Sequence, residues 1–210
     1  QPQAPAVCDG LGEWTYAELW SYSGSAAALL LRYLPPRSRG AMPRPLAIAA
    51  PRGREWYALV LAAWRLGWPV VALSFGEMAG KEATERERAS QVAKQLRPIL
   101  LVADLGVPEA IPDLPSDCLN LSFAEVQQAM SLKFAPVSVT IADDISWAVV
   151  SPDTVSCYVY TGGTTRHSKC VAVTHAMALW EVANYSIALH GQASKSDRML
   201  QFSSAYWGAA

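Results

Sequence analysis

The chain has 210 residues, of which 51% are hydrophobic and 17% charged, and its formal net charge at pH 7 is −1. This length and composition predict a globular chain with a sizeable core, either one domain or part of a larger one. The nearly neutral charge gives no electrostatic reason to expect nucleic acid or an anionic membrane as a partner. Cys8, Cys118, Cys157 and Cys170 lack metal-ligand spacing, so we expect buried free thiols in a reducing compartment such as the cytoplasm.

Helical and strand patterns alternate along the chain. The capping box Thr15-Tyr-Ala-Glu18 predicts a helix that runs to about Tyr33. The expected elements that follow are a strand over residues 46–50, a helix over 54–66 ended by Gly67, a strand over 70–74, a helix over 82–96, a strand over 99–103, a helix from Ser122, a surface connection over 136–156 and a helix over 176–189. Alternation with apolar strands predicts an α/β fold with a layered, mostly parallel sheet and flanking helices.

The apolar segment over residues 56–75 is the nearest approach to a membrane span. Arg65, Gly67 and Pro69 interrupt it and divide it into a helix and a strand. We therefore interpret it as core, with Trp56 and Trp64 as core residues. The charges in the helix over 82–96, Glu85 among them, are expected to form a solvated face.

A Gly/Thr loop follows the strand-like run that ends at Tyr160. It reads Thr161-Gly162-Gly163-Thr164-Thr165-Arg-His-Ser-Lys169, and a second β-rich run starts at Cys170. Glycine backbones, threonine hydroxyls and a lysine can together wrap a polyphosphate, although a glycine hairpin with an exposed lysine fits the local pattern equally well. A Walker A motif is excluded, because Cys170 and a strand follow the lysine where that motif has Ser or Thr and a helix.

The wider pattern around this loop resembles the adenylate-forming superfamily, which includes acyl-CoA synthetases, adenylation domains of nonribosomal peptide synthetases and luciferases. The loop from Tyr160 to Val171, with His175 after it, is similar to the phosphate-loop signature of that superfamily. The segments that resemble further family blocks, in the expected order, lie at residues 3–19, 46–73 and 198–204.

The resemblance implies a two-step ligation with ATP and Mg²⁺ as cofactors. A carboxylic acid substrate becomes an acyl-adenylate, and a thiol then takes the acyl group; coenzyme A and a carrier-protein phosphopantetheine are the implied acceptors. The phosphate-binding residues would be Thr161, Gly162, Gly163, Thr164, Thr165 and Lys169. We expect residues 1–210 to be the N-terminal portion of an adenylation domain, without its later motifs, and we identify no catalytic residue in this portion.

This copy of the loop departs from the family pattern at four positions. Gly162 stands for a usual Ser, Arg166 for a Gly, Ser168 for a Pro and Cys170 for a Gly. These departures motivate an alternative, a non-catalytic nucleotide-binding or regulatory pseudoenzyme. An unrelated Gly/Thr-loop phosphate binder such as a kinase is a third reading, which the order of the blocks disfavours.

Two further expectations concern single residues. His175 could cap the following helix or contact nucleotide, while His167 and His190 are expected to be an exposed loop residue and a helix-end residue. Amino-acid-activating members of the superfamily usually carry an aspartate where Gly208 falls here. The resemblance therefore implies a carboxylic acid without an α-amino group.

Overall fold

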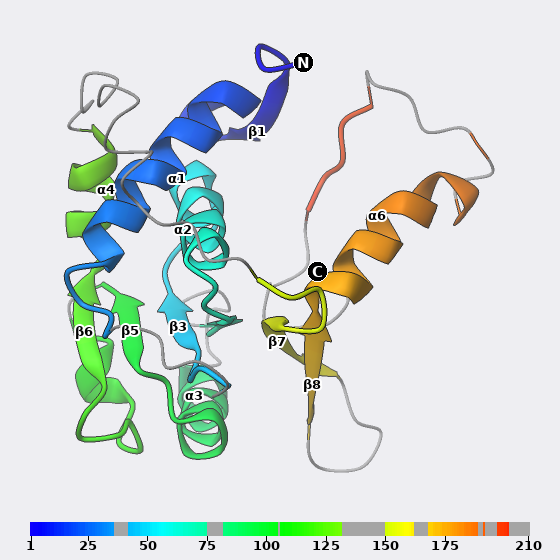
Figure 1. The fold of residues 1–210 in the computed structure, drawn as a ribbon. Coiled ribbons are helices and arrows are strands. Elements are labelled where there is room, and N and C mark those ends of the chain that lie inside the picture. Colours follow the sequence, from blue (N-terminus) through cyan, green and yellow to red (C-terminus); the bar gives the residue numbers. More distant parts are fainter. Residues whose placement is uncertain are drawn as a thin grey trace.

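The computed structural model describes residues 1–35, 42–74, 82–104, 106–131, 150–161, 168–188, 191 and 197–201. In chain order, the elements are β1 (Pro5–Asp9), β2 (Gly12–Thr15), α1 (Tyr16–Leu30), β3 (Leu46–Ala49), α2 (Arg54–Arg65), β4 (Val70–Ala72), α3 (Glu82–Leu96), β5 (Leu100–Ala103), the 3-10 helix η1 (Pro108–Ala110), β6 (Leu119–Ser122), α4 (Phe123–Ser131), β7 (Val155–Thr161), β8 (Lys169–Thr174) and α6 (His175–Ala188) (Figure 1).

Six strands of the described chain form one sheet in the order β6-β5-β3-β4-β7-β8. The pairs from β6 to β7 are parallel, and β8 runs antiparallel to β7. Strands β3 and β5 are buried along their whole length, as continuous apolar runs predict for strands covered on both faces. The prediction of a layered, mostly parallel α/β sheet is confirmed.

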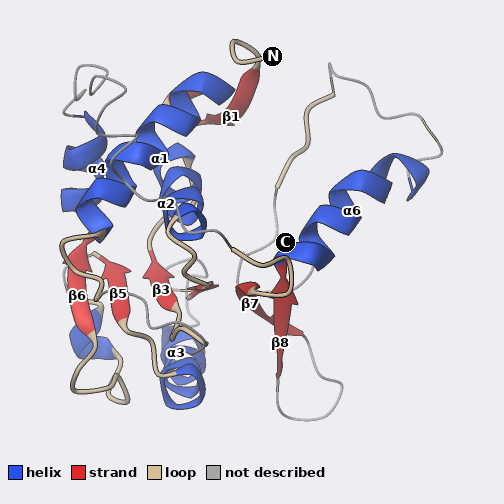
Figure 2. Ribbon diagram, viewed as in Figure 1, coloured by secondary structure: helices blue, strands red, loops and turns tan. Residues whose placement is uncertain are grey.

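Helices cover both faces of this sheet. The group α1, α2 and α4 lies on one face and α3 on the other (Figure 2). Because successive strand residues point to opposite faces, β3 contributes Leu46 and Ile48 to the larger core and Ala47 and Ala49 to the smaller core under α3. Parallel strands between these layers bring their carboxyl ends to a common edge.

The predicted helix ends are largely confirmed. The Thr15 hydroxyl accepts the Glu18 N–H at 3.2 Å, and the Glu18 carboxylate accepts the Thr15 N–H at 2.8 Å, which completes the capping box. Helix α1 ends at Leu30, three residues earlier than expected. Gly67, with φ of 74°, follows the end of α2, a conformation that favours glycine.

The segment over 56–75 divides into α2 and β4, and Trp56 is buried in the larger core while Trp64 packs against it. No helix in the described part of the chain is both long enough and apolar enough to cross a membrane.

Some strands were not predicted. β1 and β2 form an antiparallel hairpin of their own, and β6 adds a short edge strand beside β5. β7 begins at Val155, inside the expected surface connection, whose residues 136–149 lie outside the described part.

The solvated-face prediction for α3 is wrong at one residue. Glu85 is 1% exposed, and its carboxylate accepts the Ser74 hydroxyl at 2.9 Å. Ser74 lies two residues after the end of β4, so this buried hydrogen bond joins the first turn of α3 to the carboxyl edge of the sheet.

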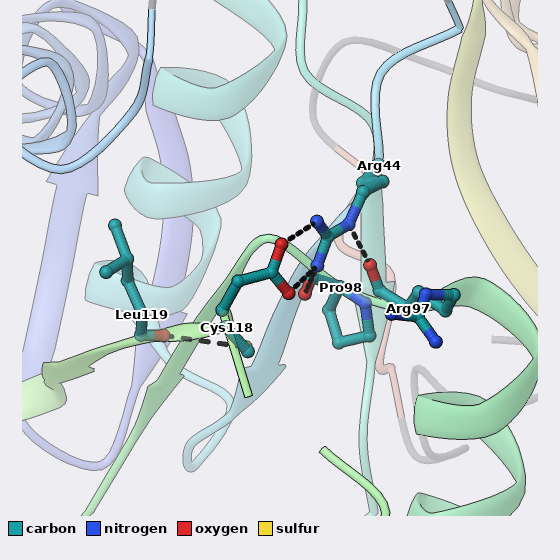
Figure 3. Close-up of polar contacts among 6 residues, drawn as sticks. Arg44, Arg97, Pro98, Cys118 and Leu119 are labelled. Carbon is teal, nitrogen blue, oxygen red and sulfur yellow. Dashed lines mark hydrogen bonds and ion pairs between the residues drawn. The ribbon is translucent and has the colours of Figure 1, made fainter. Parts of the chain in front are cut away.

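Arg44 lies just before β3, at the amino ends of the parallel strands, where its side chain forms several hydrogen bonds (Figure 3). Its guanidinium donates to both carboxylate oxygens of Asp117, at 2.7 and 3.0 Å, and to the main-chain oxygens of Arg97 and Pro98. The hydrogen bond from Arg44 is the main cause that lowers the pKa of the Asp117 carboxyl. Because these residues precede β3, β5 and β6, the contact ties together the amino ends of three parallel strands, away from the β7–β8 loop.

Candidate functional site

The predicted phosphate loop joins β7 to β8. The two strands pair antiparallel, with Thr161 opposite Lys169 and Tyr160 opposite Cys170. The two strands predicted on either side of the loop are therefore confirmed. Gly162, Gly163, Thr164 and Thr165 lie outside the described residues, together with Arg166 and His167, so their roles stay predictions.

Thr161 and Lys169 form the base of the loop, and both are exposed. Residues directly opposite each other in an antiparallel pair project from the same face, so the Thr161 and Lys169 side chains leave the same face of the sheet. Among the described residues, no acidic side chain forms an ion pair with Lys169. The base of the loop therefore offers one hydroxyl and one cation to an anionic ligand.

The position of this base in the sheet also suits a ligand. β7 is parallel to β4, so Thr161 ends its strand at the same carboxyl edge as Ser74. Open α/β sheets bind ligands in the crevice outside the carboxyl ends of their strands. The fold thus presents the Gly/Thr loop at the edge where such sites form.

Helix α2 supports the other end of the hairpin. The Trp64 indole N–H donates to the main-chain oxygen of Ser156 at 2.8 Å, and the Ser156 hydroxyl donates to the oxygen of Val173 at 2.9 Å. The sequence did not indicate this role for Trp64, because the contact joins residues that are far apart in the chain.

His175 begins α6 and packs edge-on against Trp64, with 6.0 Å between the ring centroids. Burial lowers the pKa of His175, which favours the neutral imidazole. The hydroxyl of Thr174 accepts the Met177 N–H at 3.2 Å, so Thr174 provides the side-chain cap of the helix and His175 does not. His190 lies outside the described residues.

The cysteines are free, but they are less buried than expected: Cys8 is exposed and the other three are half-buried. Burial is the main cause that raises the pKa of Cys118, to about 11, and of Cys157 and Cys170. The Cys170 side chain packs against the smaller core, where a glycine would leave space empty.

The described residues contain no metal centre: no three His, Cys, Asp or Glu side chains come together so as to hold an ion. Thr161 and Lys169, in contrast, have the chemistry that a nucleotide phosphate needs.

Comparisons with known proteins identify the family of the chain. A sequence profile of the family described as "AMP-binding enzyme" matches residues 1–210. The nonribosomal peptide synthetase ftmPS of Neosartorya fischeri is 24% identical over 204 residues, covering 97% of this chain and 8% of that protein. The synthetase ecdA of Aspergillus rugulosus is 26% identical over 204 residues, covering 97% of this chain and 2% of that protein.

Solved structures share the fold. The crystal structure of VinN has a TM-score of 0.71 at 22% identity, and the match covers 99% of this chain and 48% of VinN. ATP-bound MatB from Rhodopseudomonas palustris has a TM-score of 0.61 at 20% identity, and the match covers 91% of this chain and 35% of MatB. Because the family profile matches residues 1–210, the chain belongs to the family of AMP-binding enzymes.

Proposed function

We propose that this chain forms the phosphate-binding side of an adenylate-forming enzyme that activates a carboxylic acid with ATP. The observation that carries the proposal is the pairing of Thr161 with Lys169 at the base of a Gly/Thr loop on the carboxyl edge of the sheet. Membership of the AMP-binding family supports it, as does the ATP-bound state named for the MatB structure.

In the proposed reaction, a carboxylate oxygen of the substrate attacks the α-phosphorus of ATP. The bond between that phosphorus and the bridging oxygen breaks, and pyrophosphate leaves with the electron pair. Negative charge therefore grows on the pyrophosphate. The Lys169 ammonium, the Thr161 hydroxyl and the donors of the loop at Gly162, Gly163, Thr164 and Thr165 would stabilise that charge.

The acyl-adenylate would then pass its acyl group to a thiol. The sulfur attacks the acyl carbon and AMP leaves. The relatives named as nonribosomal peptide synthetases favour the phosphopantetheine of a carrier protein, with coenzyme A as the other candidate.

A pseudoenzyme that binds nucleotide without turnover is the second candidate. Gly162 removes a hydroxyl donor that the family usually has, and Arg166 places a side chain where the family usually has glycine. Such a protein would keep the loop and bind ATP, but it would not form an adenylate.

Binding and exchange assays on the complete protein separate these candidates. We expect Mg-ATP binding together with ATP–pyrophosphate exchange. Replacement of Lys169 by Ala should weaken Mg-ATP binding by about 1–3 kcal/mol, because a charge-assisted contact is lost, and Lys169→Arg should retain most of it. Binding without exchange would establish the pseudoenzyme. Unchanged affinity in Lys169→Ala would remove Lys169 from the site.

A further inference from the structure

Tyr160 is the residue that connects the phosphate loop to the core. It directly precedes Thr161, and its side chain is 0% exposed and packs in the smaller core under α3. The phenol is amphipathic, so its buried hydroxyl requires a hydrogen-bonding partner. That partner lies on α3: the Tyr160 hydroxyl donates to Oε1 of Gln95 at 3.1 Å.

Tyr160 also contacts the second strand of the hairpin, through packing. Cys170 lies opposite Tyr160 on β8, and its side chain packs against the smaller core that contains Tyr160. Tyr160 and Cys170 flank the Thr161–Lys169 pair on its core side. The Tyr160 side chain thus connects α3, through its hydroxyl, with β8, through its packing beside Cys170.

Helix α3 is suited to hold the ends of β7 and β8 in place, because hydrogen bonds join α3 to the sheet near both ends of the helix. Near its start, buried Glu85 accepts the Ser74 hydroxyl. Near its end, Gln95 accepts the Tyr160 hydroxyl. A shift of the Gln95 end would therefore move the ends of β7 and β8, and with them the hydroxyl and ammonium that face the ligand.

From this geometry we infer that Gln95 is a positioning residue for nucleotide phosphate binding, acting through Tyr160 on the Thr161–Lys169 pair. The inference deepens the proposed function and rests on it. Gln95 contacts no ligand in this scheme. Its amide oxygen fixes the strand ends so that the two phosphate-facing groups stay at one separation.

The test measures the affinity of the complete protein for Mg-ATP by equilibrium binding. Gln95→Leu keeps the size of the side chain but removes the acceptor, and Tyr160→Phe keeps the ring but removes the hydroxyl. If this half-buried hydrogen bond holds the Thr161–Lys169 pair in its binding arrangement, its loss should weaken the affinity of each variant for Mg-ATP by about 3-fold, and by no more than about 10-fold. Gln95→Glu retains an acceptor oxygen and should bind Mg-ATP about as tightly as the natural protein.

A double variant separates positioning from general destabilisation. If Gln95 acts through Tyr160, Gln95→Leu adds no further loss to Tyr160→Phe. Unchanged Mg-ATP affinity in the single variants, with a lowered melting temperature, would mean a purely structural contact and overturn the inference. If the natural protein binds no ATP, the proposed function and this inference both fall. If the natural protein binds ATP but shows no ATP–pyrophosphate exchange, the Mg-ATP affinities of the Gln95 and Tyr160 variants still decide the role of Gln95.

Discussion

At the scale of single residues, burial raises the pKa of three thiols in this chain and so lowers their reactivity. The pKa of Cys118 is raised to about 11, mainly by burial, and those of Cys157 and Cys170 are raised for the same reason. Because the thiolate is the nucleophile, a higher pKa means fewer reactive molecules at a given pH. Cys8 differs, since it is exposed on the β1–β2 hairpin.

We therefore predict that a thiol reagent modifies Cys8 first. At pH 8, a pKa of about 11 leaves Cys118 with a thiolate fraction ~100-fold smaller than that of a thiol with a pKa of 9. Alkylation followed by peptide mass spectrometry measures each site, with a Cys8→Ser variant and a denatured sample as controls. Equal labelling of Cys118 and Cys8 in the folded protein would contradict the prediction.

The sequence predicts the chemistry of single residues better than it predicts what surrounds them in the fold. The hydroxyls and the cation of the loop follow from residue type, and the structure adds that Lys169 begins β8. The burial of Glu85 does not follow from the charged sequence of α3, because it depends on a hydrogen bond with Ser74, which lies after β4. The hydrogen bond of Tyr160 to Gln95 was missed for the same reason.

At the scale of elements, one ion pair ties the β1–β2 hairpin to the start of α2. The Asp9 carboxylate accepts the main-chain N–H of Arg54 and that of Leu11, each at 2.9 Å, and pairs with the Arg54 guanidinium at 3.2 Å. Burial opposes the ionised form, but these donors and the charge of Arg54 together lower the pKa of Asp9. The guanidinium also lies 5.1 Å from the centre of the Trp14 ring.

This pair predicts a defined pH dependence. A carboxyl whose pKa is lower in the folded state contributes its full stabilisation above its unfolded pKa of about 4, and the contribution is lost as the pH falls through the folded pKa. Asp9→Ala should cost about 1–3 kcal/mol near pH 7. Asp9→Asn keeps an acceptor for the two N–H groups but removes the charge, so it should cost less.

Melting temperatures of the natural protein and both variants, measured from pH 7 down to pH 3, check this prediction. The gap between the natural protein and Asp9→Asn should be widest at pH 7 and narrow below pH 4. A gap independent of pH would show that the ionised carboxylate contributes nothing.

The elements that the sequence predicted correctly carry strong local signals. The capping box at Thr15 and the apolar runs of β3 and β5 each specify their structure within a few residues. The β1–β2 hairpin was missed although Asp9-Gly10 is a turn signal, because its strands are short and largely outside the core. β6 was missed because a four-residue edge strand is defined by its pairing with β5.

At the scale of the whole molecule, α6 differs from the other helices in what covers it. α1, α2, α3 and α4 pack on the sheet, whereas α6 exposes most of its large apolar side chains. Those at least half exposed are Met177, Leu179, Trp180, Val182 and Ile187. Exposed apolar surface on this scale marks an interaction surface or a tendency to associate.

We predict that residues 1–210, produced alone, self-associate and do not catalyse adenylation. The match to VinN covers 99% of this chain but only 48% of that protein, so this chain spans about half of a structure that shares its fold. Replacing Trp180 and Ile187 together with Glu should reduce association, as measured by light scattering and by binding of an apolar dye. Pyrophosphate release by the isolated chain above that of its Lys169→Ala variant would overturn the catalytic part of this prediction.

Under the proposed function, the choice of acid would be a property of the complete protein, and Gly208 is a residue of this chain that bears on it. The resemblance implies an aspartate there in members that bind an α-ammonium group, and a buried ammonium without a counter-charge is strongly disfavoured. We therefore predict that the complete protein prefers a carboxylic acid without an α-amino group. Residues 202–210 lie outside the described part, so the prediction rests on the sequence.

Exchange assays across matched acids decide this prediction. Each α-amino acid is paired with the acid that lacks only the amino group, and the panel includes L-aspartate and 3-methylaspartate, which are named in the VinN complexes. Gly208→Asp supplies the missing counter-charge, so it should shift the preference towards the amino acid of each pair. A clear preference of the natural protein for an α-amino acid would show that another group in the complete pocket holds the ammonium, and that the inference from Gly208 is wrong.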